Sequence, residues 1–129
     1  MASPGVGKIP AVRAVLPLAV VVAVAASAAC GVPSDPEKQA EEVASVAAEG
    51  ALLAQDGAAG DSTSAFVRTH ADALRKRLAT LRPKIMEPAL VPLADETATA
   101  LELLAEDPSA VGVAARLERA SARADDLAR

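Results

Sequence analysis

Residues 64–82 read SAFVRTHADALRKRLATLR, and this stretch decides the fold. Its apolar residues recur at spacings of 4, 3, 4 and 3, at Val67, Ala71, Leu74, Leu78 and Leu81. Such spacing places them along one face of an α-helix, while basic and polar residues occupy the other faces. The segment therefore predicts an amphipathic helix whose apolar face must be covered by other parts of the chain.

Three further segments carry the same periodicity and predict helices over residues 36–55, 92–106 and 108–128. Asp35-Pro36 and Asp107-Pro108 each pair an N-cap acid with a first-turn proline, which is typical of a helix start. Glycines within 56–61 are expected to end the first helix. Runs of β-branched or aromatic residues between turn residues do not occur, so no strand is expected. We expect an all-α fold, a small antiparallel three- or four-helix bundle over residues 36–129.

The stretch 82–92 separates the second and third predicted helices and contains prolines at 83, 88 and 92. Proline disfavours helical geometry in the residue before it, so we expect Arg82, Glu87 and Val91 to be extended or in turns. The third helix then begins at Pro92, or at Pro88 with a kink at Pro92. Four large apolar residues make this stretch the best candidate for an exposed apolar loop: Ile85, Met86, Leu90 and Val91. The alternative is that it wraps the end of the bundle.

The core of such a bundle is expected to be thin. The chain has 129 residues, of which 33 are Ala, one is Phe and none is Trp or Tyr. Because each Ala contributes little buried area, a bundle of this size is only marginally stable. The alanines and Gly50 let helices approach closely. Either the helices pack tightly through these small faces, or one face stays open for a partner or a second copy.

Charge alternates in sign along the predicted helices. Residues 35–61 carry seven acids and one base, 66–84 six bases and one acid, and 87–107 six acids and no base. Short links make consecutive helices antiparallel neighbours, so the alternation predicts opposite charges side by side. Random scatter in a composition rich in Ala, Arg and Glu is the alternative explanation. Each exposed ion pair contributes only about 0–1 kcal/mol, so the pattern bears on which helices adjoin rather than on stability.

The first thirty residues have a different composition. Lys8 and Arg13 precede a stretch without charge from Ala14 to Ser34, whose centre, 15–26, is apolar apart from one proline. A basic start, an apolar run of about a dozen residues and small residues before a cut are the parts of a secretory signal. We therefore expect a signal peptide over residues 1–29 and a tether over 30–35.

Ser27-Ala28-Ala29-Cys30 resembles the lipobox of bacterial lipoproteins, with Ser27 where Leu is usual. The resemblance implies cleavage between Ala29 and Cys30, diacylglycerol in thioether linkage on Cys30, and acylation of the new α-amine. Two acyl chains anchor stably because each buried methylene gains about 0.8 kcal/mol. The chain is thus expected to be held by a lipid anchor at the extracytoplasmic face of the cell membrane. Abundant Pro, Ala and Arg without Asn is typical of proteins from GC-rich bacteria such as actinobacteria.

Two other readings of the N-terminal segment stay open. One is an uncleaved transmembrane anchor, since a span needs roughly 20 apolar residues. The other is ordinary signal cleavage after Ala29 without lipidation. In all three readings Lys8 and Arg13 stay in the cytoplasm, so residues 30–129 lie outside.

Candidate chemistry is sparse. Cys30 and His70 are the single Cys and the single His, too few for a zinc site, and no metal or cofactor is expected. His70 has no nucleophile in a strained turn to activate, so we expect no enzyme and a partly exposed His on the side of the bundle. A net charge of −4 and a single Phe, with no Trp or Tyr, argue against binding to nucleic acid.

One concentrated basic surface is predicted, and it comprises Arg68, Arg75, Lys76, Arg77, Arg82 and Lys84. If this surface is functional, it contacts anionic headgroups or wall polymers. The alternative is that it is a solvent-exposed face whose charges balance those of the acidic neighbouring helices. We expect a non-enzymatic interaction or structural role in the cell envelope, with an envelope protein or a second copy as partner. The alternative function is binding of a small ligand between helices.

Overall fold

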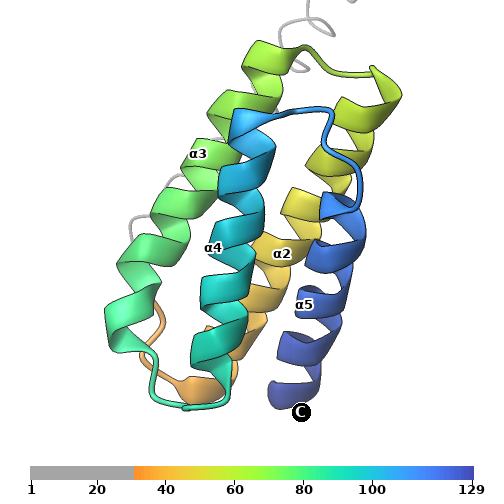
Figure 1. Cartoon of the computed structure of the whole chain (residues 1–129). Helices are drawn as coiled ribbons and strands as arrows, with labels where there is room; N and C mark the ends of the chain where they lie inside the picture. Colours follow the sequence, from red (N-terminus) through yellow and green to blue (C-terminus); the bar gives the residue numbers. More distant parts are fainter. Residues whose placement is uncertain (1–30) are drawn as a thin grey trace, which may run out of the picture. The chain divides into compact units, whose positions relative to one another are not determined.

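Four α-helices run alternately up and down in the part of the chain that the computed structural model describes, residues 31–129 (Figure 1). They are α2 (Pro36–Ala59), α3 (Ser64–Leu81), α4 (Leu90–Glu106) and α5 (Val113–Leu127), with a 3-10 turn, η1 (Arg82–Lys84), after α3. No strand occurs within residues 31–129. The predicted all-α bundle is thus confirmed, in its four-helix form.

In cross-section the four helices lie at the corners of a square, and each packs against the helices at the two adjacent corners. α2 packs most extensively against α5 and α3 against α4, while α2–α3 and α4–α5 close the square and α2 touches α4 across it. The start of α2, the α3–α4 connection and the C-terminus lie at one end of the bundle (Figure 1). The α2–α3 and α4–α5 connections lie at the other end.

The apolar face predicted for residues 64–82 is buried at every position, from Val67 to Leu81. It packs against α4 and belongs to one core cluster with buried leucines of α4 and α5, among them Leu101, Leu104 and Leu117. Apart from Gln39 and Leu53, the buried side of α2 is built from small residues: Ala40, Val43, Ala44, Val46, Ala47, Gly50, Ala51 and Ala54. The core therefore combines large leucines from three helices with one helix of small side chains.

Gly50 shows how close this packing is. A Cβ atom added there would lie 2.8 Å from Leu101 Cδ2 and 3.1 Å from Leu117 Cδ1, and both leucine side chains are fully buried. Buried side chains in a dense core have little room to move. The expectation of tight packing through small residues is confirmed at this position.

α2 is longer than predicted. The sequence placed its end at residue 55, but the helix continues through Gly57 to Ala59 and ends at Gly60, which has a φ of 76°. Gly57 is retained inside the helix because the chain between α4 and α5 packs against it: an added Cβ would overlap the carbonyl oxygen of Pro108. The glycine read as a helix breaker thus serves a close backbone approach.

α5 starts later than predicted. Asp107-Pro108 does not open it; the helix begins at Val113, after Gly112 with a φ of 87°. The Asp107 carboxylate instead accepts hydrogen bonds from Ser109 N (3.1 Å) and Ser109 Oγ (2.8 Å) and so holds a turn. The same local signal, an acid that caps a backbone N–H, suits a turn as well as a helix start.

α4 begins two residues before the predicted Pro92. Pro92 is its third residue, where the backbone N–H has no partner within the helix, so proline costs no hydrogen bond there. Val91 is helical, and Arg82 has helical angles (φ −48°, ψ −48°). The expectation that these two residues are extended or in turns is therefore wrong.

Gly57→Ala is expected to lower the free energy of unfolding by about 1–3 kcal/mol, because the new methyl group overpacks against Pro108. Helix propensity alone predicts a gain of about 1 kcal/mol. Thermal and denaturant unfolding followed by circular dichroism measures the difference.

Ala48→Gly, at an exposed position of the same helix, is the control for propensity and should cost about 1 kcal/mol. A stabilised Gly57→Ala variant would contradict the close approach of Pro108.

Candidate functional site

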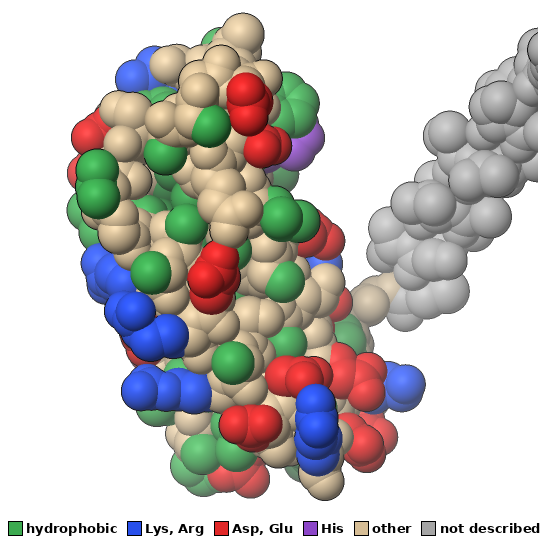
Figure 2. Space-filling model, turned by 90° about the vertical axis from the view of Figure 1, so that its right-hand side faces the viewer, with side chains coloured by type: hydrophobic (Ala, Val, Ile, Leu, Met, Phe, Trp, Pro, Cys, Tyr) green, Lys and Arg blue, Asp and Glu red, His purple; other side chains and the backbone are tan. Residues whose placement is uncertain are grey.

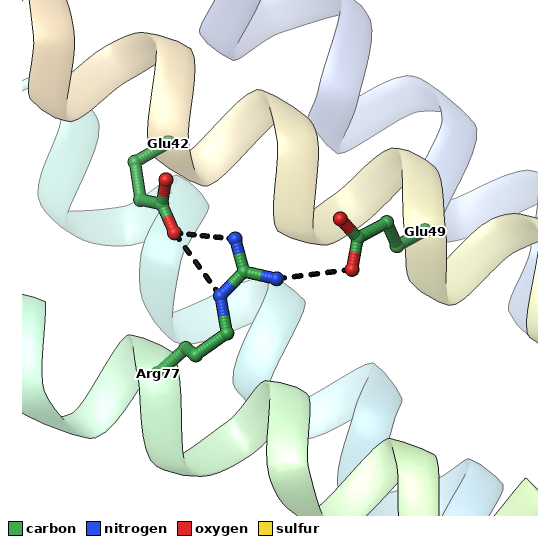
Figure 3. Close-up of polar contacts among 3 residues, drawn as sticks. All are labelled: Glu42, Glu49 and Arg77. Atoms are coloured by element: carbon green, nitrogen blue, oxygen red, sulfur yellow. Dashed lines mark hydrogen bonds and ion pairs between the residues drawn. The ribbon is translucent and has the colours of Figure 1, made fainter. Parts of the chain in front are cut away.

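The most connected residue of the predicted basic surface is Arg77 of α3. Its Nη2 lies 2.6 Å from Glu42 Oε1 and its Nη1 lies 3.0 Å from Glu49 Oε2, so one guanidinium joins α3 to two turns of α2 (Figure 3). Partial burial lowers the pKa of Arg77, but the hydrogen bonds and charges of Glu42 and Glu49 outweigh it and raise the pKa. Arg77 is therefore a cation held between two helices.

Arg82, in η1, makes the corresponding contact with the other acidic helix. Its Nε lies 2.8 Å and its Nη2 3.3 Å from the carboxylate oxygens of Asp95 on α4. The hydrogen bond from Arg82 and its charge lower the pKa of Asp95, against an opposing effect of desolvation. Together with the Arg77 contacts, this pair confirms that the alternating charge blocks bring opposite charges side by side.

The other basic residues are bound more locally. Arg75 and Lys76 lie 3.6 Å and 3.1 Å from Asp72 within α3, and Arg68 Nε donates to the carbonyl oxygen of Ala105 (3.2 Å). Lys84 is exposed and makes no ion pair within residues 31–129. All six lie on α3 and η1, and contact with an anionic surface stays a prediction for them.

His70 lies on the exposed side of α3, as predicted. Its ring stacks on Phe66 with centroids 4.0 Å apart, and its Nδ1 lies within hydrogen-bond distance (3.2 Å) of the Phe66 carbonyl oxygen. Within the described residues, no group of three or more His, Cys, Asp or Glu side chains is placed to hold a metal ion.

Two shallow grooves flank the exposed side of α2, and Leu52, which is 63% exposed, stands between them. The groove toward α5 has a volume of about 620 Å³ and the groove toward α3 about 390 Å³. The α5 groove has a floor of small side chains and acids at its rim, Glu41, Glu118 and Asp125. Figure 2 shows the side of the molecule that carries α5 and α2, where apolar, acidic and basic side chains are interspersed.

Gln39 is a buried polar position whose structural role sequence reasoning missed. Its side chain is fully buried, and its amide Nε2 donates to the carbonyl oxygens of Pro33 (3.1 Å) and Lys84 (2.7 Å). Its Oε1 accepts from the backbone N–H of Met86 (3.0 Å). One side chain of α2 therefore ties the tether before α2 to the α3–α4 connection. The only signal in the sequence was a polar residue on the apolar side of a helix.

The α3–α4 connection both wraps the end of the bundle and exposes apolar surface. Leu90 is fully buried, and Ile85 and Val91 are half-buried, whereas Met86 is 63% exposed. The prediction of an exposed apolar loop and the alternative that the stretch wraps the end of the bundle are thus each correct for part of it.

The predicted signal peptide and its sites, Ala29 and Cys30, lie outside the described residues, which begin at Gly31. Among the helices of residues 31–129, none is both long and apolar enough to span a bilayer. Comparison with protein-family models, with curated proteins and with solved structures finds no match for this chain.

Gln39→Leu is expected to lower the free energy of unfolding by about 1–3 kcal/mol, because it leaves partly buried backbone groups of two segments without their side-chain partner. The backbone amide of Met86 should also exchange its hydrogen faster. Gln55→Leu is the matched control: Gln55 is exposed and bonds only Glu118, so we expect a change within about 0.5 kcal/mol. Equal effects of the two substitutions would contradict the role given to Gln39.

Asp95→Asn is expected to destabilise the protein at neutral pH but not in acid. The folded-state pKa of Asp95 lies below its ordinary value of 3.8, so the unfolded chain takes up the proton at a higher pH than the folded chain. The contribution is complete above the ordinary value and is lost as the pH falls through the lowered one. Unfolding measured across this range tests it, with Glu102→Gln, an exposed acid of the same helix, as control. A difference from wild type that persists at the lowest pH would contradict it.

Proposed function

We propose that this chain is an extracytoplasmic lipoprotein, anchored through Cys30, whose helical bundle has a non-enzymatic binding or structural role in the cell envelope. The proposal joins two parts of the chain. Residues 1–30 supply the export and lipidation signal, through the basic start, the apolar run and the lipobox-like Ser27-Ala28-Ala29-Cys30. Residues 32–129 supply the folded body.

The observation that carries the proposal is the position of the boundary between these parts. Val32–Arg129 forms one compact unit, and α2 begins at Pro36, six residues after Cys30. The buried apolar core of the described residues is shared among α2, α3, α4 and α5. A cut before Cys30 would therefore leave this unit whole, as export with removal of a signal peptide requires.

The surface of α2 supports a binding role. Leu52 is largely exposed between two open grooves, and singly exposed leucines are ordinary unless the surroundings form a recess. Here the recesses lie on both sides of the side chain. They are shallow and open to solvent, which suits the surface of a macromolecule better than an enclosed small molecule.

Binding of a small ligand is the second candidate function. The volume of the α2–α5 groove, about 620 Å³, falls within the rough range of 300–1,000 Å³ for ligand pockets. An apolar pocket lined by leucines near residues 85–93 would favour this function. Leu90 and Leu93 are instead buried in the core, so they offer no such lining.

Intact-mass measurement of the protein extracted from membranes tests the anchor. We expect a chain that begins at Cys30 and carries diacylglycerol, and we expect Cys30→Ser to abolish both the cut and the lipid mass. A matched control, Cys30→Ser combined with Ser34→Cys, keeps one thiol but moves it out of the lipobox, and it should stay unlipidated. Unmodified Cys30 on a chain that retains residues 1–29 would sink the proposal.

A further inference from the structure

The tether before α2 is short and is held at its end. Val32 is half-buried against the core, and the Pro33 carbonyl oxygen accepts from Gln39 Nε2 at 3.1 Å. Only three residue steps separate Pro33 from Cys30, so these two residues are at most about 11 Å apart even in a fully extended chain. The bundle end that holds Pro33 therefore stays close to whatever surface holds Cys30.

The same Gln39 side chain holds the tip of the α3–α4 connection at that end. Its bonds to Lys84 O (2.7 Å) and Met86 N (3.0 Å) fix the backbone on both sides of Ile85. Ile85 turns partly inward, whereas the Met86 side chain is 63% exposed and the Lys84 side chain is exposed beside it. The tip thus presents a flexible apolar side chain between an exposed ammonium group, Lys84, and an exposed carboxylate, Glu87, and the apolar side chain is the part suited to the acyl-chain boundary.

The opposite end of the bundle lies far from the point of attachment. α2 rises about 27 Å between Gln39 and Gly57, at 1.5 Å per residue, and Gly57 lies against Pro108 of the α4–α5 connection. Val111, which is 98% exposed, belongs to that distant connection. The tether length therefore distinguishes two exposed apolar side chains, one at each end.

We propose that the α3–α4 tip, centred on Met86 with Lys84 beside it, is a second membrane contact that inserts into the lipid surface in which Cys30 is anchored. The bundle then stands with this end on the bilayer and the α4–α5 connection pointing away from it. This inference rests on the proposed function, because the lipid on Cys30 is what holds the tip at the surface.

The absence of Trp from the chain allows a direct test. Met86→Trp and Val111→Trp each introduce a single indole at an exposed position, one at each end. Each full-length variant is expressed in bacteria, purified with its lipid, and reconstituted into vesicles of phosphatidylglycerol and phosphatidylcholine with brominated acyl chains. Intact mass establishes the lipid on Cys30, and circular dichroism establishes the fold.

We expect the indole at position 86 to lose at least about half of its emission to the brominated lipids, since interfacial side chains lie about 5–10 Å deep. The indole at position 111 should lose none. Equal quenching at both positions, or none at 86, would overturn the inference while the lipid mass leaves the proposed function standing. A blue shift at 86 without bromine quenching would mean that a second copy covers the tip, which also overturns it. A chain without lipid on Cys30 would overturn both proposals.

Discussion

The approach of α2 to its neighbours is the constraint on which this bundle depends. Gly50 brings α2 within contact distance of the side-chain ends of Leu101 and Leu117, and alanines extend this close packing along the helix. Large side chains on one helix and small ones on the other fill the interior without voids. This arrangement gives a chain with a single Phe a continuous core. Its cost is low tolerance at Gly50, because a methyl group added there meets two leucines that are already confined.

The helices and their buried faces could be predicted from the sequence because the period of apolar residues is a direct consequence of helix geometry. The stretch from Val67 to Leu81 is the clearest example, and every position of its predicted face is buried. The pairing of basic α3 with acidic α2 and α4 was also predictable, since short connections make successive helices neighbours.

The start of α2 at Asp35-Pro36 was predicted correctly, but the end of α2, the start of α5 and the hydrogen bonds of Gln39 could not be predicted. The end of α2 and the bonds of Gln39 depend on contacts between distant parts of the chain, and the start of α5 depends on a turn that shares its local signal with a helix start. Gly57 looks like a helix breaker until Pro108 is seen against it, and Asp107-Pro108 looks like a helix start until its acid is seen to hold a turn. Gln39 bonds to Lys84 and Met86, which lie 45 and 47 residues away. No local pattern marks which polar residue on an apolar face will find such partners.

The clamp at Gln39 also decides how the bundle responds to a pull. Tension on the chain before Val32 first reaches Val32, which packs against the core, and then Pro33, where the hydrogen bond to Gln39 transmits it to α2 and the α3–α4 connection together. Force applied to one terminus of an unclamped helix peels it away turn by turn, breaking one bond at a time. Here the load is shared by two segments that are far apart in the sequence. Mechanical unfolding therefore begins when the hydrogen bonds of Gln39 break together, rather than with fraying of the first helical turn.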